Sequence, residues 1–155
     1  MGRVDYYDDP NAPAANSLVP AASAVVTDGS GRILLHRRRD NDQWALPGGV
    51  MELGESLGEC VVREVREETG FDVEPVGIVG IYSDPRHVFA YDDGEVRQEF
   101  SVCFECRITA GTLSVSDESY EVEFFTADEI ALLPMVDRVR LRVTDFLSGS
   151  EPSIR

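Results

Sequence analysis

The sequence has no apolar run near the length that is needed to span a bilayer, and no secretory signal peptide pattern. Its three cysteines are an odd number, and the single C-x-x-C, Cys103 and Cys106, has no second Cys pair. Because these two lie three positions apart in a strand-like run, they are expected to face opposite sides and to be structural. The absences predict a reduced, cytoplasmic protein with no membrane partner.

Positive charge is also scarce. The chain carries 14 Lys and Arg against 29 Asp and Glu, a formal net charge of −15. A nucleic-acid polymer would be repelled by such a protein, so we exclude it as a partner. A small anionic nucleotide would still need arginines gathered locally. There are no internal repeats, and 155 residues suffice for one domain with one good core.

The clearest pattern lies between Gly49 and Phe71. Pro47-Gly48-Gly49 is a turn signal, and Gly70 is a typical helix stop. Between Ser56 and Thr69 the apolar residues recur at helical spacing, which predicts an amphipathic helix packed on a core. These residues are Leu57, Val61, Val62 and Val65.

Three carboxylates lie at the margin of this apolar stripe. Glu64 and Glu68 are four residues apart and point the same way, with Glu67 one step further round. Such a cluster is costly unless a cation sits among the acids, and oxygen ligands without His or Cys indicate Mg²⁺ or Mn²⁺. The alternative is a solvated acidic helix with i,i+4 ion pairs such as Glu59 with Arg63.

The spacing of fixed residues in this stretch resembles the signature of the Nudix hydrolases. Every fixed position of that signature is matched, by Gly49, Glu55, Arg63, Glu64, Val65, Glu67, Glu68, Gly70 and Phe71. A match over 23 residues is far more specific than a lone Gly-rich tripeptide.

The resemblance implies a loop-helix-loop that binds a divalent metal ion and cleaves a diphosphate linked to another group, X. It implies an α/β fold, an α/β/α sandwich with a mixed, curled sheet between helices. Its metal ligands would be Glu64, Glu67 and Glu68, with the backbone at Gly49 near the ion. The remaining motif residues would be mainly structural: Arg63, which bridges acids, Glu55, which is also a candidate for a further metal contact, and Gly70.

The flanking segments divide the chain into an extension, a domain and a tail. Residues 1–19 are expected to be either a mobile extension or an ordered one that packs on the domain or on a partner subunit, 20–149 the Nudix domain, and 150–155 a tail. Strands are predicted at Ala22–Thr27, Arg32–Arg38, Trp44–Gly49, Asp72–Tyr82, His87–Tyr91 and Val96–Ile108, and further helices at Thr126–Leu133 and Met135–Leu147.

Arginines and one tryptophan are the candidates for substrate binding. Arg37 ends the second strand where related hydrolases place an arginine on phosphate, whereas Arg38 is expected on the opposite face. Edge-strand solubility is the alternative role of these arginines. Trp44 either packs in the core or offers a stacking surface, and Arg97 is a candidate for specificity.

The base that activates water is the least determined residue. Glu64 is one candidate, but a carboxylate bound to metal is a poor proton acceptor. Several Nudix hydrolases take a Glu from a loop further along the chain. That loop corresponds to Asp117–Glu121, which makes Glu118 the first choice and Glu121 the second.

The sequence therefore predicts a Mg²⁺- or Mn²⁺-dependent pyrophosphohydrolase that acts on a nucleoside diphosphate linked to X. The alternative is a Nudix-like module that binds a nucleotide or a protein without hydrolysis. No second signature identifies X. The oligomeric state is open, although members of the family are often homodimers.

Overall fold

The computed structural model describes residues 2–149 and 151–155; residues 1 and 150, which begin the predicted extension and tail, lie outside the described part. A mixed eight-stranded sheet forms its centre, in the order β11-β4-β3-β10-β7-β12, with β5 paired to β4 and β6 to β3. Its strands are β3 (Ala21–Thr27), β4 (Ile33–Arg38), β5 (Trp44–Ala45), β6 (Gly48–Val50), β7 (Phe71–Tyr82), β10 (Ser101–Gly111), β11 (Ser119–Phe125) and β12 (Ser153–Ile154).

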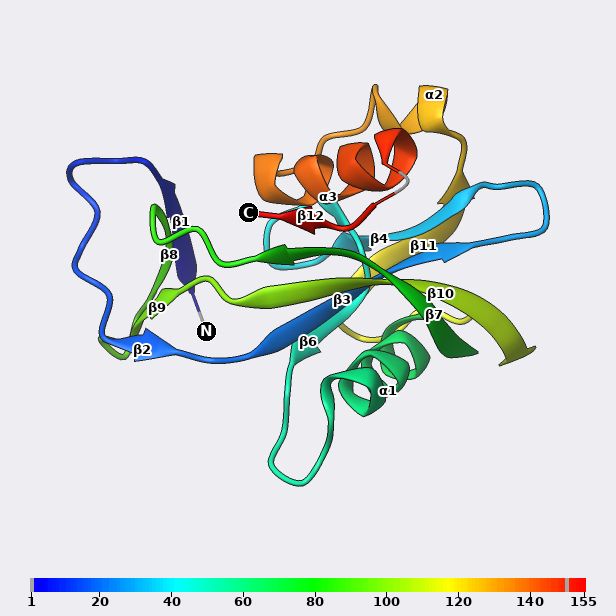
Figure 1. The fold of residues 1–155 in the computed structure, drawn as a ribbon, viewed down its shortest axis with the longest axis horizontal. Coiled ribbons are helices and arrows are strands. Elements are labelled where there is room, and N and C mark those ends of the chain that lie inside the picture. Colours follow the sequence, from blue (N-terminus) through cyan, green and yellow to red (C-terminus); the bar gives the residue numbers. More distant parts are fainter. Residues whose placement is uncertain (1, 150) are drawn as a thin grey trace.

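Helices cover both faces of this sheet, so the predicted sandwich is confirmed (Figure 1). Helix α1 (Leu57–Thr69) lies on one face, and α3 (Asp137–Ser148) lies on the other, preceded by the short α2 (Ala127–Ile130). Each face has its own core. The α1 side buries Leu34, Cys60, Val61, Val65 and Cys106, and the α3 side buries Leu35, Trp44, Cys103, Phe125 and Val143. Cys103 and Cys106 thus face opposite sides as predicted, and both are free thiols.

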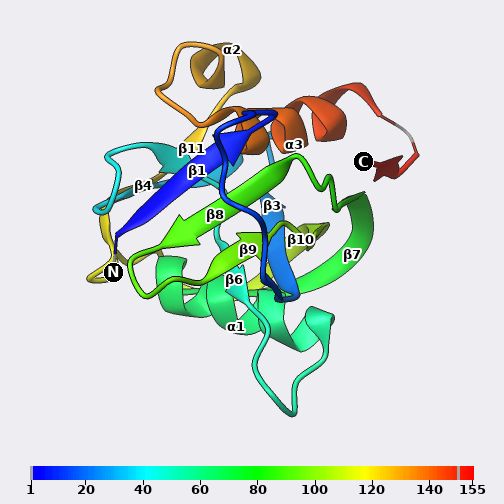
Figure 2. The same ribbon diagram turned by 90° about the vertical axis from the view of Figure 1, so that its left-hand side faces the viewer.

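A second sheet of four strands stands beside the large one (Figure 2). Its order is β1-β8-β9-β2, from β1 (Arg3–Tyr7), β8 (His87–Tyr91), β9 (Val96–Gln98) and β2 (Ser17–Leu18). Two of its strands, β1 and β2, come from the amino-terminal segment, and β1 pairs antiparallel to β8. Among the described residues, no helix has both the length and the apolar character that a bilayer crossing requires.

Several predicted elements are shorter or divided. The strand predicted at Val96–Ile108 is broken at Glu99 and Phe100, because Glu99 turns inward to a buried ion pair with Arg142. The strand predicted at Trp44–Gly49 is interrupted at Leu46 and Pro47, where proline has no N–H to donate to a ladder. Helix α2 ends at Ile130 and α3 begins at Asp137, both inside their predicted ranges.

The ends of α1 follow the local signals in the sequence. Ser56 is the N-cap, and its Oγ accepts a 3.1 Å hydrogen bond from the backbone N–H of Glu59. Gly70 ends the helix with φ of 82°, a left-handed conformation that glycine adopts without strain. These two caps fix the length of the helix and hence the positions of its acidic residues.

Candidate active site

Strand β6 and helix α1 meet at Gly49. A Cβ added at Gly49 would lie 2.4 Å from Oε1 of Glu64, which is closer than any side chain tolerates. A Cβ on Gly48 would lie 2.3 Å from the carbonyl oxygen of Ala22 in the neighbouring strand. Gly48 therefore requires glycine, because its backbone passes directly against β3, whereas a side chain at Gly49 would displace the carboxylate of Glu64.

Glu68 is a buried carboxylate held against this backbone. Its Oε2 accepts a 3.0 Å hydrogen bond from the N–H of Gly48, and its side chain is 7% exposed. Burial raises the pKa of Glu68, and the charge of Glu64 adds to the rise. Burial also raises the pKa of Glu64, although Arg63 opposes the shift. Glu64 and Glu68 are thus adjacent carboxylates, and the positive charge around them is too small for both to be ionised without a cost in free energy.

Arg63 organises the acidic residues on the outer side of the motif. Its Nε donates to Glu55 at 2.9 Å and its Nη2 to the other Glu55 oxygen at 2.7 Å, a bidentate pair. The same guanidinium donates to Glu64 at 2.9 Å, to Glu67 at 3.3 Å and to the carbonyl of Val50 at 3.1 Å. Arg63 thereby links the loop to the helix, the structural role that the resemblance implies.

His36 belongs to the site, although sequence reasoning did not single it out. Its Nε2 lies 3.6 Å from Oε2 of Glu68, and its Nδ1 lies 2.7 Å from Oγ of Ser119. Burial, with the nearby charge of Arg38, lowers the pKa of His36 to about 4, so the ring is neutral at pH 7. The signal available in the sequence was the alternation of β4, which places His36 on the same face as Leu34, toward α1.

The acidic residues of the motif suit a hard divalent cation. Within residues 2–149 and 151–155, no three His, Cys, Asp or Glu side chains are already arranged as a metal-ion site. Glu67 is the outlying member, 59% exposed and paired with Arg63. The two inner carboxylates, buried side by side with raised pKa values, are oxygen donors whose mutual repulsion a cation would relieve. The residues present therefore fit Mg²⁺ or Mn²⁺.

The expected orientation of the two arginines at the end of β4 is wrong. Arg38 lines the cleft beside Gly48 and Gly49, and it lies close enough to Glu68 for the two charges to interact. Arg37 instead donates to Glu121 at 2.9 Å and to Asp42 at 2.5 Å, and does not line the cleft. The physical reason is that the even-numbered residues of β4 face α1. The sequence alone did not establish whether the even-numbered or the odd-numbered residues face that side.

The two acids proposed as the base lie in different elements. Glu118 is an exposed residue of the loop before β11, and its charge helps to raise the pKa of Glu68. Its carbonyl oxygen accepts a 3.0 Å hydrogen bond from the N–H of Arg39. Glu121 lies within β11 rather than in the loop, and it pairs with Arg37. Glu118, but not Glu121, thus lies near enough to Glu68 for the two charges to interact.

The two other substrate-binding candidates differ in position. Trp44 is 6% exposed and stacks edge-to-face on Phe125, with ring centroids 4.8 Å apart, so it packs in the core. Arg97 lies on β9, pairs with Glu95 at 2.8 Å and lines the cleft. The cleft has a volume of about 150 Å³ and lies between the motif loop and the small sheet.

The chain matches the NUDIX domain over residues 17–146. A MutT-like protein of Streptomyces ambofaciens is 36% identical over 135 residues, which cover 87% of this chain and 80% of that protein. An ADP-ribose pyrophosphatase of Methanocaldococcus jannaschii is 35% identical over 117 residues, 71% of this chain and 66% of that protein. A putative 8-oxo-dGTP diphosphatase of Bacillus subtilis is 30% identical over 131 residues, 84% of this chain and 80% of that protein.

The fold has counterparts among solved structures. A solved structure of a NUDIX hydrolase from Nitrosomonas europaea matches with a TM-score of 0.70, over 88% of this chain and 93% of that one. The sequences are 21% identical, so this likeness concerns the fold alone.

Proposed function

Because this chain belongs to the NUDIX domain family and is a hydrolase of pyrophosphate bonds, we propose that it cleaves a nucleoside diphosphate linked to another group, X, with the aid of a divalent cation. Relatives named for ADP-ribose and for 8-oxo-dGTP support a nucleotide-derived substrate. A module that binds without hydrolysis would have no use for the complete set of acids Glu64, Glu67 and Glu68.

The residues that would hold Mg²⁺ or Mn²⁺ are Glu64, Glu67 and Glu68, with the backbone carbonyl of Gly49 beside them. When bound, the cation neutralises charge on the diphosphate and increases the acidity of coordinated water. Arg63 keeps Glu64 and Glu55 in place through its hydrogen bonds of 2.7 to 2.9 Å. His36 is neutral at pH 7 and lies beside Glu68, so it does not offset the charge of that carboxylate.

Arg38 is the residue that we assign to the phosphates. Burial lowers its pKa, but Asp40, Glu68 and Glu118 together hold that pKa above its ordinary value, so Arg38 stays charged. Its guanidinium lines the cleft next to Gly48 and Gly49, which lets it contact a diphosphate that is bound at the motif. Arg37 lies on the opposite face of β4, so we assign it no contact with the substrate phosphates.

Glu118 is our choice for the general base. A carboxylate oxygen of Glu118 accepts a proton from the attacking water as the water oxygen bonds to phosphorus, and the bond from phosphorus to the bridging oxygen breaks. Glu118 lies in an exposed loop, whereas the carboxylate of Glu64 is engaged with Arg63. Glu64 is the alternative base.

One observation carries the proposal: the carboxylates of Glu64 and Glu68 lie together beside the glycines of β6, and burial raises the pKa of both. The test is a substrate panel of ADP-ribose, a dinucleoside polyphosphate, coenzyme A and 8-oxo-dGTP, incubated with and without Mg²⁺. Release of nucleoside monophosphate or phosphate products is measured by chromatography. Metal-dependent hydrolysis of at least one compound is expected, and hydrolysis that persists after removal of divalent cations would contradict the proposal.

A further inference from the structure

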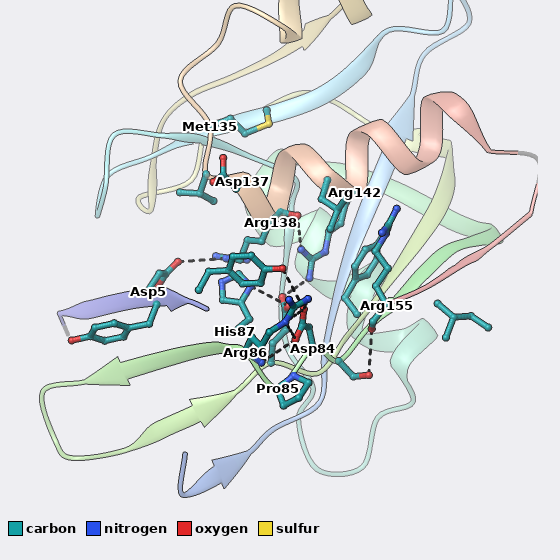
Figure 3. A pocket seen from close by; sticks show the side chains of 18 residues that line it. Asp5, Asp84, Pro85, Arg86, His87, Met135, Asp137, Arg138, Arg142 and Arg155 are labelled. Carbon is teal, nitrogen blue, oxygen red and sulfur yellow. Dashed lines mark hydrogen bonds and ion pairs between the residues drawn. The ribbon is translucent and has the colours of Figure 1, made fainter. Parts of the chain in front are cut away.

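A second and larger cavity adjoins the cleft. It measures about 970 Å³ and lies between β1, the start of β8, the first turns of α3 and the carboxy-terminal strand (Figure 3). We call it the α3 cavity. None of its lining residues belongs to the motif between Gly49 and Phe71. Three residues line both spaces, Glu99, Arg138 and Arg142, so they form the boundary between the cleft and the α3 cavity.

The charge around these two spaces is opposite to that of the whole chain. Of the 14 basic residues, all of them arginines, seven line the cleft or the α3 cavity, compared with four of the 29 acidic residues. The acids are Asp5, Asp84, Glu99 and Asp137. Arg3, Arg38 and Arg97 line only the cleft, Arg86 and Arg155 only the α3 cavity, and Arg138 and Arg142 both. In a protein of net charge −15, such a concentration of cations is suited to an anionic ligand.

Most of these arginines already have a close carboxylate partner. Arg142 lies 2.6 Å from Glu99, and Arg86 lies 2.7 Å from Asp84. Arg38, Arg97 and Arg155 pair with Asp40, Glu95 and Asp145 at 2.7, 2.8 and 2.9 Å. Apart from Arg38, which we assign to the scissile diphosphate despite its pair with Asp40, these pairs leave little free charge for a ligand.

Arg3 and Arg138 differ, because they share one carboxylate. Nε of Arg3 lies 2.9 Å from one oxygen of Asp5, and Nε of Arg138 lies 3.5 Å from the other. Figure 3 shows the side chain of Arg138 descending from α3 toward Asp5 on β1. The two guanidiniums also flank the same ring, with their central carbons 5.0 and 5.1 Å from the centroid of Phe89. The single carboxylate of Asp5 is thus shared by the guanidinium groups of Arg3 and Arg138.

The cost of this arrangement falls on Arg138. Its side chain is 18% exposed, and burial together with the charge of Arg3 lowers its pKa to about 10. A largely buried guanidinium whose charge is only half offset by a carboxylate gains more binding free energy from an anion than a solvated guanidinium does. Phosphate oxygens are well suited to it, since arginine donates to them in a planar, bidentate geometry.

We infer that Arg138, assisted by Arg3, forms an anion subsite that binds a phosphate group of the substrate beyond the scissile diphosphate. This inference rests on the proposed function and narrows its substrate class. It favours a nucleotide with an additional phosphate over one in which X and the nucleoside are uncharged. The subsite also gives the amino-terminal strand β1 a role, because β1 supplies both Arg3 and Asp5.

The first test measures binding apart from hydrolysis. Inorganic phosphate is titrated into the full chain by calorimetry in the absence of divalent cations, where the acids of the motif repel anions. Wild-type protein is expected to bind phosphate, Arg138→Met to bind at least about tenfold more weakly, and Arg138→Lys to retain part of the affinity. The control is Arg107→Met, because Arg107 is exposed and pairs with Glu74 on the far end of the sheet.

No phosphate binding by the wild type, or equal binding by wild type and Arg138→Met, would overturn the subsite. Thermal denaturation of each variant verifies that it is folded, and Arg3→Met provides a second variant should Arg138→Met unfold. Because this titration needs no turnover, its failure is distinguishable from failure of the proposed hydrolase activity.

The second test compares two substrates that differ by one phosphate, ADP-ribose and 2′-phospho-ADP-ribose, with Mg²⁺ present. The expected result is a higher kcat/KM for the phosphorylated compound in the wild type, and a drop of about tenfold in this preference for Arg138→Met through KM. A wild-type preference for the unphosphorylated compound, or an equal loss on both compounds, contradicts the inference.

Discussion

Glu68 accepts a hydrogen bond of 3.0 Å from the backbone N–H of Gly48, twenty positions earlier in the chain. The bond fixes the last turns of α1 against strand β6, and the neutral ring of His36 lies 3.6 Å from the same carboxylate oxygen. Glu68 thus joins three segments at the point where the motif would hold its cation. Its burial makes the residue costly in the absence of that cation.

Replacing Glu68 by glutamine tests this cost. We expect Glu68→Gln to increase the unfolding free energy of the metal-free protein by about 1–2 kcal/mol and to raise its melting temperature, because a neutral amide replaces a carboxyl group whose ionised form is disfavoured by burial. The same change should abolish the rise in Tm that Mg²⁺ produces in the wild type and lower turnover by about 10²-fold. Thermal denaturation with and without Mg²⁺ measures both effects.

Glu67→Gln is the matched comparison, since Glu67 is 59% exposed. It should leave the metal-free Tm unchanged and still weaken the Mg²⁺-induced rise. If both variants keep the full Mg²⁺ effect and full activity, Glu67 and Glu68 are not metal ligands.

Arg38 and Arg37 provide a test of strand orientation. Arg38 lines the cleft, so Arg38→Ala should lower kcat/KM by about 10- to 100-fold, or about 2 kcal/mol of transition-state stabilisation. Arg37 is engaged with Asp42 and Glu121, and Arg37→Ala should change kcat/KM less than about threefold. Steady-state kinetics of the two variants decide the point, and a larger loss for Arg37→Ala would refute this orientation.

The choice of base is tested by Glu118→Gln and Glu121→Gln. We expect Glu118→Gln to reduce kcat by about 10² to 10⁴-fold with little change in Mg²⁺ affinity, the usual range for loss of a general base. Glu121 lies in β11 and pairs with Arg37, so its variant should have nearly wild-type kcat. Wild-type turnover by Glu118→Gln, together with an inactive Glu64→Gln that still binds metal, would assign the role to Glu64.

Glu99 should make stability depend on pH. Burial alone would raise its pKa, but His87 and Arg142 lower it from 4.5 to about 2 in the folded protein. Because the folded pKa is below the unfolded one, this stabilisation is complete above pH 4.5 and is lost as pH falls through 2. It amounts to about 3 kcal/mol at 1.36 kcal/mol per pKa unit.

Urea denaturation at several pH values measures this effect. The free energy of unfolding should differ most between wild type and Glu99→Gln at pH 7, and the difference should shrink toward pH 2. Glu123→Gln is the control, since Glu123 is exposed on β11. A difference that does not vary with pH would show that Glu99 contributes through packing rather than charge.

Local signals account for what the sequence predicted well. The helix α1, its Ser56 cap and its Gly70 end follow from residue types at fixed spacing, and so does the capping box of Thr126 and Glu129. The resemblance supplied the fold class and named the acids. The position of Glu118 in the folded chain could not be predicted from the local sequence pattern, although the resemblance to the Nudix hydrolases indicated its loop.

Features that depend on contacts between distant segments were missed. Alternation along β4 indicates that Arg37 and Arg38 face opposite sides, but not which side is the cleft. His36 became a partner of Glu68 only because β4 and α1 meet in the fold. The strand β1 has no period of its own, and its residues pair with β8 residues that lie 80 positions (Tyr7 with His87) to 88 positions (Arg3 with Tyr91) further along the chain.

The central claim is that water attacks a phosphorus atom of the diphosphate in a reaction that needs a divalent cation. The most direct measurement is hydrolysis of the best panel substrate in ¹⁸O-labelled water, with and without Mg²⁺, followed by mass spectrometry of both products. The account predicts that the label enters a phosphate group, and only when Mg²⁺ is present. Label in the non-phosphate part of a product, or incorporation at the same rate without divalent cations, would contradict it.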